Sequence, residues 1–265
     1  MIQLRELIYP FRHKKEMKHM LLCIAIFVFM AVPFKAMTLV EGFTEVRPVN
    51  AVPVIAGLLF GPAGAWGCAI GNVVSDLFGS FSLTSLLGFF GNFIAAYVPY
   101  RIWHIVKSGE SPNVKTHGNL GFYIYISGIG AMATGIFITG GLDLFFGYWS
   151  WDLMVIIMVN DFLFPVFLGL PVLIVLTSDD HQFPAYMPSH GHTNQHLDSY
   201  SGHHTQKKVR GLRKHAKKSC CFFAFITIIL FFMFNMGMNL SAAIWLQVLG
   251  GLFLLAILAL VFTDG

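Results

Sequence analysis

The chain has 265 residues, of which 56% are hydrophobic and 11% charged, and its formal net charge is +4. In soluble domains roughly a quarter of the residues are charged, so this composition argues against a soluble fold. Several apolar stretches exceed the roughly 18 residues that cross the hydrocarbon core as a helix, so we predict an all-α, multi-span membrane protein.

The first half of the chain predicts one long span followed by a broken hairpin. A basic N-terminus over residues 1–19 precedes the first span, at 20–41, and the boundary carries no small-residue cleavage site, so we expect this span to be retained. The second segment, 48–61, is too short to cross the membrane upright, and a Gly-Pro-Ala-Gly sequence separates it from the third, 63–79. Interrupted helices persist in lipid only where protein or water covers the freed backbone groups.

The third segment combines a small-residue face with polar residues. Ala63, Gly67 and Gly71 recur every four residues, and such a face lets a neighbouring helix approach closely. Asn72 and Asp76 are also four residues apart, so they share one side of the helix.

Arg47 and Asn50 open the second segment at the level of Asn72 and Asp76. We therefore predict that the broken hairpin brings these four side chains together around a shallow cavity that faces outward. The alternative interpretation is that Arg47 and Asp76 form only a salt bridge that ties the two helix ends.

The remaining predicted spans are 82–106, 120–142 and 151–176, followed by a hairpin of 219–236 and 241–262. With a cytoplasmic N-terminus, all of the 17 Lys and Arg residues except Lys35 and Arg47 fall on the inner side. The positive-inside rule then predicts about eight spans with both termini inside.

A carboxylate also lies deep in the sixth span. Asp161, flanked by Asn160, is roughly ten residues from the start of this span, and an ionisable residue at such depth is a functional-site hypothesis by default. We therefore add Asn160 and Asp161 to the candidate substrate-binding residues, with Lys35 and Glu41 as second choices.

The segment 178–218 is polar, basic and rich in histidine, and we interpret it as a cytoplasmic loop. Neutral imidazoles with this close spacing are candidate ligands for zinc, nickel or copper, although a solvated linker is the alternative. The candidate metal ligands are His190, His192, His196, His203 and His204. The basic run before residue 219 is expected to anchor the chain to anionic lipid heads rather than to bind nucleic acid.

The stretch "EVRPVNAVPVIAGLLFGPAGAWGCAIGNVVSDLFGSFSLTSLLGFFGNFIAAYVPYRIW", residues 45–103, resembles the substrate-binding membrane subunit, or S component, of energy-coupling factor (ECF) vitamin transporters. It is especially similar to the subset proposed to carry queuosine precursors. The resemblance covers about residues 15–178 and implies a six-span bundle over 20–177 in a prokaryotic cell membrane, extended by the two-span hairpin within 219–265. It also implies a binder of a small water-soluble, vitamin-like compound, with its site in the outer half of the bundle.

The resemblance further implies separate partners, namely one transmembrane coupling subunit and ATPase subunits. The chain contains no Walker A sequence, so ATP hydrolysis would have to come from those partners. The A-x-x-x-A pattern with which family members dock the coupling subunit is missing from the first span, where Cys23, Ala25, Ala31 and Ala36 are the small residues.

Two other functions stay open: a multi-span membrane sensor, or a secondary or metal transporter that uses the histidine-rich loop. An enzyme is disfavoured because no H-E-x-x-H, G-x-S-x-G or comparable signature occurs. We expect no cofactor. The Trp66, Trp149 and Trp151 rings are candidates to stack on a planar substrate, and interfacial anchoring is the alternative for the last two.

Overall fold

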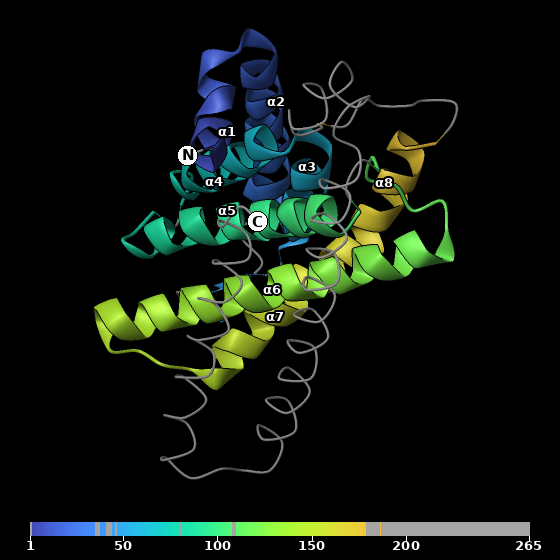
Figure 1. Cartoon of the computed structure of the whole chain (residues 1–265). Coiled ribbons are helices and arrows are strands. Elements are labelled where there is room, and N and C mark those ends of the chain that lie inside the picture. Colours follow the sequence, from blue (N-terminus) through green and yellow to red (C-terminus); the bar gives the residue numbers. More distant parts are fainter. Residues whose placement is uncertain are drawn as a thin grey trace, which may run out of the picture. The chain divides into compact units, whose positions relative to one another are not determined.

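A computed structural model of the chain describes residues 2–34, 38–40, 44–45, 47–79, 81–107, 110–178 and Tyr186. Its α-helices are, in chain order, α1 (Ile2–Arg12), α2 (Lys14–Ala31), α3 (Ala51–Phe60), α4 (Pro62–Asp76), α5 (Thr84–Val106), α6 (His117–Phe146), α7 (Trp151–Phe164) and α8 (Leu170–Leu176) (Figure 1). The shorter elements are the 3-10 turns η1 (Val32–Phe34) and η2 (Pro48–Asn50), the π-helical turn η3 (Pro165–Gly169), and the antiparallel strands β1 (Thr38–Val40) and β2 (Thr44–Glu45).

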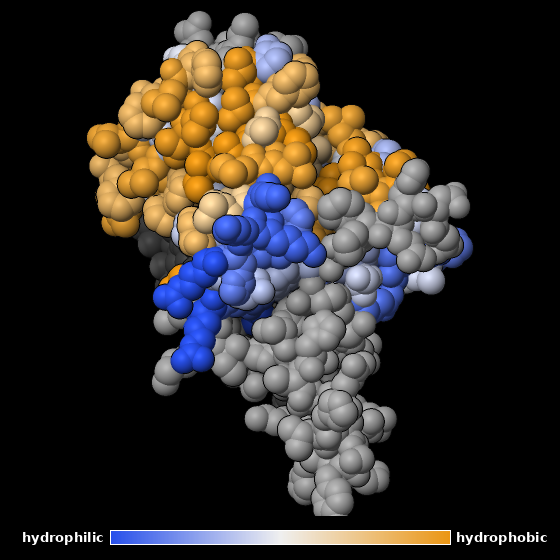
Figure 2. Space-filling view, turned by 90° about the horizontal axis from the view of Figure 1, so that it is seen from above, coloured by the Kyte–Doolittle hydropathy of each residue, from blue (hydrophilic) through white to orange (hydrophobic). Residues whose placement is uncertain are grey.

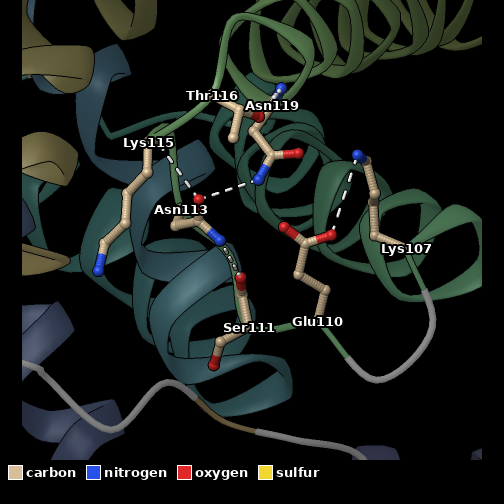
Figure 3. Close-up of polar contacts among 7 residues, drawn as sticks. All are labelled: Lys107, Glu110, Ser111, Asn113, Lys115, Thr116 and Asn119. Carbon is tan, nitrogen blue, oxygen red and sulfur yellow. Dashed lines mark hydrogen bonds and ion pairs between the residues drawn. The ribbon is translucent and has the colours of Figure 1, made fainter.

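Two compact units make up the chain, one of residues 1–103 with 111–187 and the other of residues 104–110 with 188–265. All helix packing described below lies within the first unit. In the second unit, the described residues include Lys107 and Glu110, whose Nζ and Oε2 atoms are 3.9 Å apart (Figure 3).

Three described segments are long and apolar enough to cross a membrane: Lys14–Phe34, His117–Phe146 and Trp151–Leu176. The prediction of a helical membrane protein is therefore confirmed, while the number of eight spans and their orientation stay predictions. The short segment Pro48–Phe60 matches the expectation of a half-length second helix. The predicted C-terminal hairpin, 219–265, lies outside the described residues.

The first span differs from the prediction of 20–41. The helix begins earlier, at Lys14, the chain is extended at β1, before the predicted end at residue 41, and the described part of the span reaches Phe34. Pro33 accounts for this end, because its ring fixes φ and removes a backbone donor. The N-terminus, expected only as a basic segment, forms helix α1, and the two short strands add an element that the all-α prediction lacked.

The small-residue face of α4 packs against α2, as its spacing predicts. A Cβ placed on Gly67 would lie 2.5 Å from the Cβ of Cys23, and one on Gly71 would lie 2.8 Å from the Cβ of Phe27. Side chains larger than hydrogen would force the two helices apart. The position of α4 against α2 therefore depends on these glycines.

Helices α3 and α4 are separated at Gly61, whose φ of +56° lies in the region that favours glycine. Tyr186 covers this break: its backbone N–H donates to the carbonyl of Leu59 at 2.8 Å, and its ring lies against Gly61. Burial, with the nearby Glu6 carboxylate, raises the pKa of the Tyr186 phenol above its ordinary value, so the ring stays neutral in this position.

Helix α1 is fixed to the bundle by three polar contacts. The indole Nε1 of Trp66 donates to the carbonyl of Leu7 at 2.9 Å, and the Glu6 carboxylate accepts from the Tyr100 hydroxyl and pairs with Arg101 at 3.3 Å. The hypothesis that Trp66 stacks on a substrate is therefore not supported, because its ring packs among Phe11, Phe89 and Phe93 and its nitrogen holds α1.

Polar side chains form hydrogen bonds within the turn that leads into α6 (Figure 3). Oδ1 of Asn113 accepts from the backbone of Lys115 at 3.1 Å and from Nδ2 of Asn119 at 2.9 Å. The hydroxyl of Thr116 caps the helix by accepting from the backbone N–H of Asn119. These hydrogen bonds stabilise the turn and the start of α6.

Apolar side chains cover much of the described surface in Figure 2. On α2 the exposed large ones are Met17, Leu21, Leu22, Ile26 and Phe29, and Phe29 is 80% exposed. Large apolar patches on a soluble surface are unusual. In a protein with membrane-length helices, they are the faces that contact lipid or other membrane proteins.

Candidate functional site

The centre of the candidate site is the three-residue turn η2. The backbone N–H of Asn50 donates to the carbonyl of Arg47 at 2.9 Å, which closes the turn, and Pro48 fixes the backbone at its first position. The side chains of Arg47 and Asn50 consequently start from the two ends of one short, rigid segment. Both are half-buried.

From the first end, Arg47 reaches helix α4. Its Nη2 donates to Oδ1 of Asn72 at 2.9 Å, and Nδ2 of Asn72 donates onward to Oδ2 of Asp76 at 3.2 Å. Asn72 is 1% exposed and Asp76 is 7% exposed. The described hydrogen bonds thus connect Arg47 to Asp76 through the amide of Asn72, while the alternative of a direct salt bridge between the two charges stays a prediction.

From the second end, Asn50 reaches helix α7. Its Nδ2 donates to Oδ1 of Asp161 at 2.5 Å, and the positive charge of Arg47 also acts on the Asp161 carboxylate. The turn therefore links α4 and α7 through one side-chain hydrogen bond at each of its ends.

Five of the residues predicted to bind substrate thus form one connected network: Arg47, Asn50, Asn72, Asp76 and Asp161. Asn160 precedes Asp161 on α7 and is half-buried. Lys35 and Glu41 lie outside the described residues, as do the candidate metal ligands His190, His192, His196, His203 and His204.

Sequence reasoning missed one member of the network, Asn92 on α5. Its Nδ2 donates to Oδ1 of Asn72 at 3.2 Å and to the carbonyl of Gly88 at 2.9 Å. The signal was an amide side chain inside an otherwise apolar helix. Such a residue needs a partner, and Gly88, one turn earlier, leaves the space in which Asn72 approaches.

The network combines one cation, two carboxylates and three amides. Side chains of this kind bind polar small molecules, because guanidinium recognises carbonyl or anionic groups and carboxylates accept from amines or ring N–H groups. Asp161 and Arg47 are half-buried, while Asn72 and Asp76 are buried behind them. Asn50 is half-buried as well, so the members of the network differ in exposure.

A family model described as QueT transporter matches residues 17–178, which is more than half of the chain. The match extends from α2 to α8 and includes every residue of the network above. No curated protein and no solved structure matches the chain significantly.

Proposed function

Because the chain belongs to the QueT transporter family, we propose that it is the substrate-binding membrane subunit, or S component, of an ECF-type importer. In this proposal it binds a small water-soluble, vitamin-like compound of the queuosine-precursor kind. Separate coupling and ATPase subunits in the cell membrane drive uptake.

The observation that supports this proposal most strongly is the connected network of Arg47, Asn72, Asp76, Asn50 and Asp161. Charged groups among apolar helices are costly, and they are retained where they pair or bind a ligand. Three segments that are distant in sequence, η2, α4 and α7, supply these groups to one place. A substrate-binding site explains why they meet.

We assign complementary roles to the network residues. The guanidinium of Arg47 binds a carbonyl or anionic group of the substrate. The amides of Asn50 and Asn72 bind its heteroatoms or position the charged groups next to them. The carboxylate of Asp161, or that of Asp76, binds an amine or amidine-like edge.

The packing of α2 bears on how partners dock. Cys23, one of the small residues on this helix, is buried against α4, so it is not available for a coupling subunit. The exposed side of α2 carries larger side chains, among them Leu22, Ile26 and Phe29. In this proposal a coupling subunit that docks on α2 meets this bulky apolar side.

The decisive experiment purifies the full chain from its native membranes and analyses bound small molecules and co-purifying proteins by mass spectrometry. We expect a polar heterocyclic compound together with a coupling subunit and ATPase subunits. Arg47→Ala should retain the partner proteins but lose the compound, whereas Arg12→Ala, on the exposed side of α1, should retain both. Co-purification of a kinase or cyclase in place of ATPases would instead support the sensor alternative.

A further inference from the structure

Asn92 occupies a fixed position beside the proposed binding site. Its Nδ2 carries two hydrogens, one for the carbonyl of Gly88 in its own helix and one for Oδ1 of Asn72 in α4. The bond to Gly88 anchors the amide to the backbone of α5. Asn92 therefore presents a donor to Asn72 from a rigid support.

The amide of Asn72 has two chemically opposite ends, and its orientation decides which group each end meets. In the structure Oδ1 accepts from both Arg47 and Asn92, while Nδ2 donates to Asp76. A rotation by half a turn would set Nδ2 against two donors and Oδ1 against a carboxylate oxygen. Both contacts would be repulsive.

The surroundings of Asn72 leave little room for other arrangements. Its side chain is 1% exposed, so water cannot replace a lost partner. Helix α5 also lies close, since a Cβ on Gly88 would be 2.7 Å from Nδ2 of Asn72. Buried polar networks of this kind are rigid when every member is satisfied and costly when one is removed.

We propose that Asn92 is a positioning residue that fixes the amide of Asn72 and thereby holds Arg47 in its place for substrate. The role of Arg47 toward substrate rests on the proposed function, but its placement by Asn92 does not. Asn92 acts through Asn72 and makes no contact of its own with Arg47 among the described hydrogen bonds.

The test measures the rate at which phenylglyoxal, an arginine-directed reagent, modifies Arg47 in the full chain in detergent. A guanidinium that is held less firmly should react faster. Labelling of each arginine is followed by mass spectrometry. We expect Asn92→Ala to increase the labelling rate of Arg47 about fivefold, which corresponds to one lost hydrogen bond. The rate at exposed Arg12 should stay the same, and buried Arg101 should stay protected, which reports that the fold is intact.

A double-mutant comparison identifies the route of the effect. In the Asn72→Ala background, Asn92→Ala should have no further effect on Arg47 labelling, because the intermediary is already missing. If Asn92→Ala cannot be purified, Asn92→Leu removes the same donor at similar volume. Unchanged Arg47 labelling in either variant, or equal effects in both backgrounds, would overturn the proposal. Because the probe requires no transported compound, this result is independent of whether the protein is an importer subunit.

Discussion

Nη2 of Arg47 lies 2.9 Å from Oδ1 of Asn72, a residue 25 positions later in the chain, on helix α4. Through this amide, the guanidinium of Arg47 is linked to the carboxylate of Asp76, because Nδ2 of Asn72 donates to Oδ2 of Asp76 at 3.2 Å. The position of the guanidinium is therefore tied to the orientation of the Asn72 amide.

We predict that Arg47→Lys weakens binding of the compound recovered from the purified protein by about tenfold or more. Lysine keeps the charge but lacks the planar fork that bonds to Asn72 and ligand together. Titration calorimetry on the variant measures the change in Kd. Arg12→Lys is the matched control, because Arg12 is exposed at the end of α1, and its Kd should equal that of the wild type.

Asp161→Asn removes the carboxyl group that contacts Asn50, at the α7 end of turn η2, but keeps the shape of the side chain. The new amide oxygen can still accept from Asn50, so the fold should persist, but the carboxyl group on which the positive charge of Arg47 acts is lost. We expect a loss of affinity of about 10- to 100-fold, since hydrogen bonds to charged groups contribute about 1.5–3 kcal/mol. Asp152→Asn, at an exposed position on the same helix, should bind normally. Equal affinities in the two variants would remove Asp161 from the site.

Gly88→Ala tests the space beside Asn72. The added methyl group would lie 2.7 Å from Nδ2 of Asn72, so that either the amide or α5 must shift. Overpacking of this kind costs about 1–3 kcal/mol, and we expect a lower Tm together with weaker binding. The matched substitution is Gly121→Ala in α6, where no atom lies within 4 Å of the new Cβ. It should leave Tm unchanged or raise it, because alanine favours a helix over glycine.

Glu6→Gln tests the attachment of α1. The neutral amide can still accept from Tyr100, but Arg101 loses the nearby charge in a setting where both side chains are less than a tenth exposed. We expect destabilisation by about 2 kcal/mol, observed as a lower Tm in detergent.

Glu110→Gln provides the control for Glu6→Gln, since it removes a more exposed carboxylate whose pair with Lys107 spans 3.9 Å. Surface pairs of this geometry contribute little, so its Tm should change by less than that of Glu6→Gln. A larger effect at Glu110 than at Glu6 would contradict the assigned anchoring role.

The sequence predicted the members of the site better than their connections. Asn72 and Asp76 follow from helical spacing, and Asp161 follows from the cost of a charge in an apolar span. The pairing of Asn50 with Asp161 could not be predicted, because it depends on how α7 packs against η2, which is more than 100 residues away in the chain. Pattern reasoning grouped Arg47, Asn72 and Asp76, but it did not predict that the amide of Asn72 would accept from Arg47 and donate to Asp76.

The early end of the first span shows a similar limit. Hydropathy alone continued the helix to residue 41, whereas Pro33 and the strand at Thr38–Val40 end it earlier. The break at Gly61 was predicted correctly, since a glycine followed by proline carries its own conformational signal.

The closed turn from Arg47 to Asn50 has a mechanical consequence. The side chain at one end is hydrogen-bonded to α4 and the side chain at the other end to α7, so this short turn connects the two helices. Any tilt of α7 that pulls on Asn50 must also shift Arg47, and deletion of a single residue between them would disconnect both helices at once.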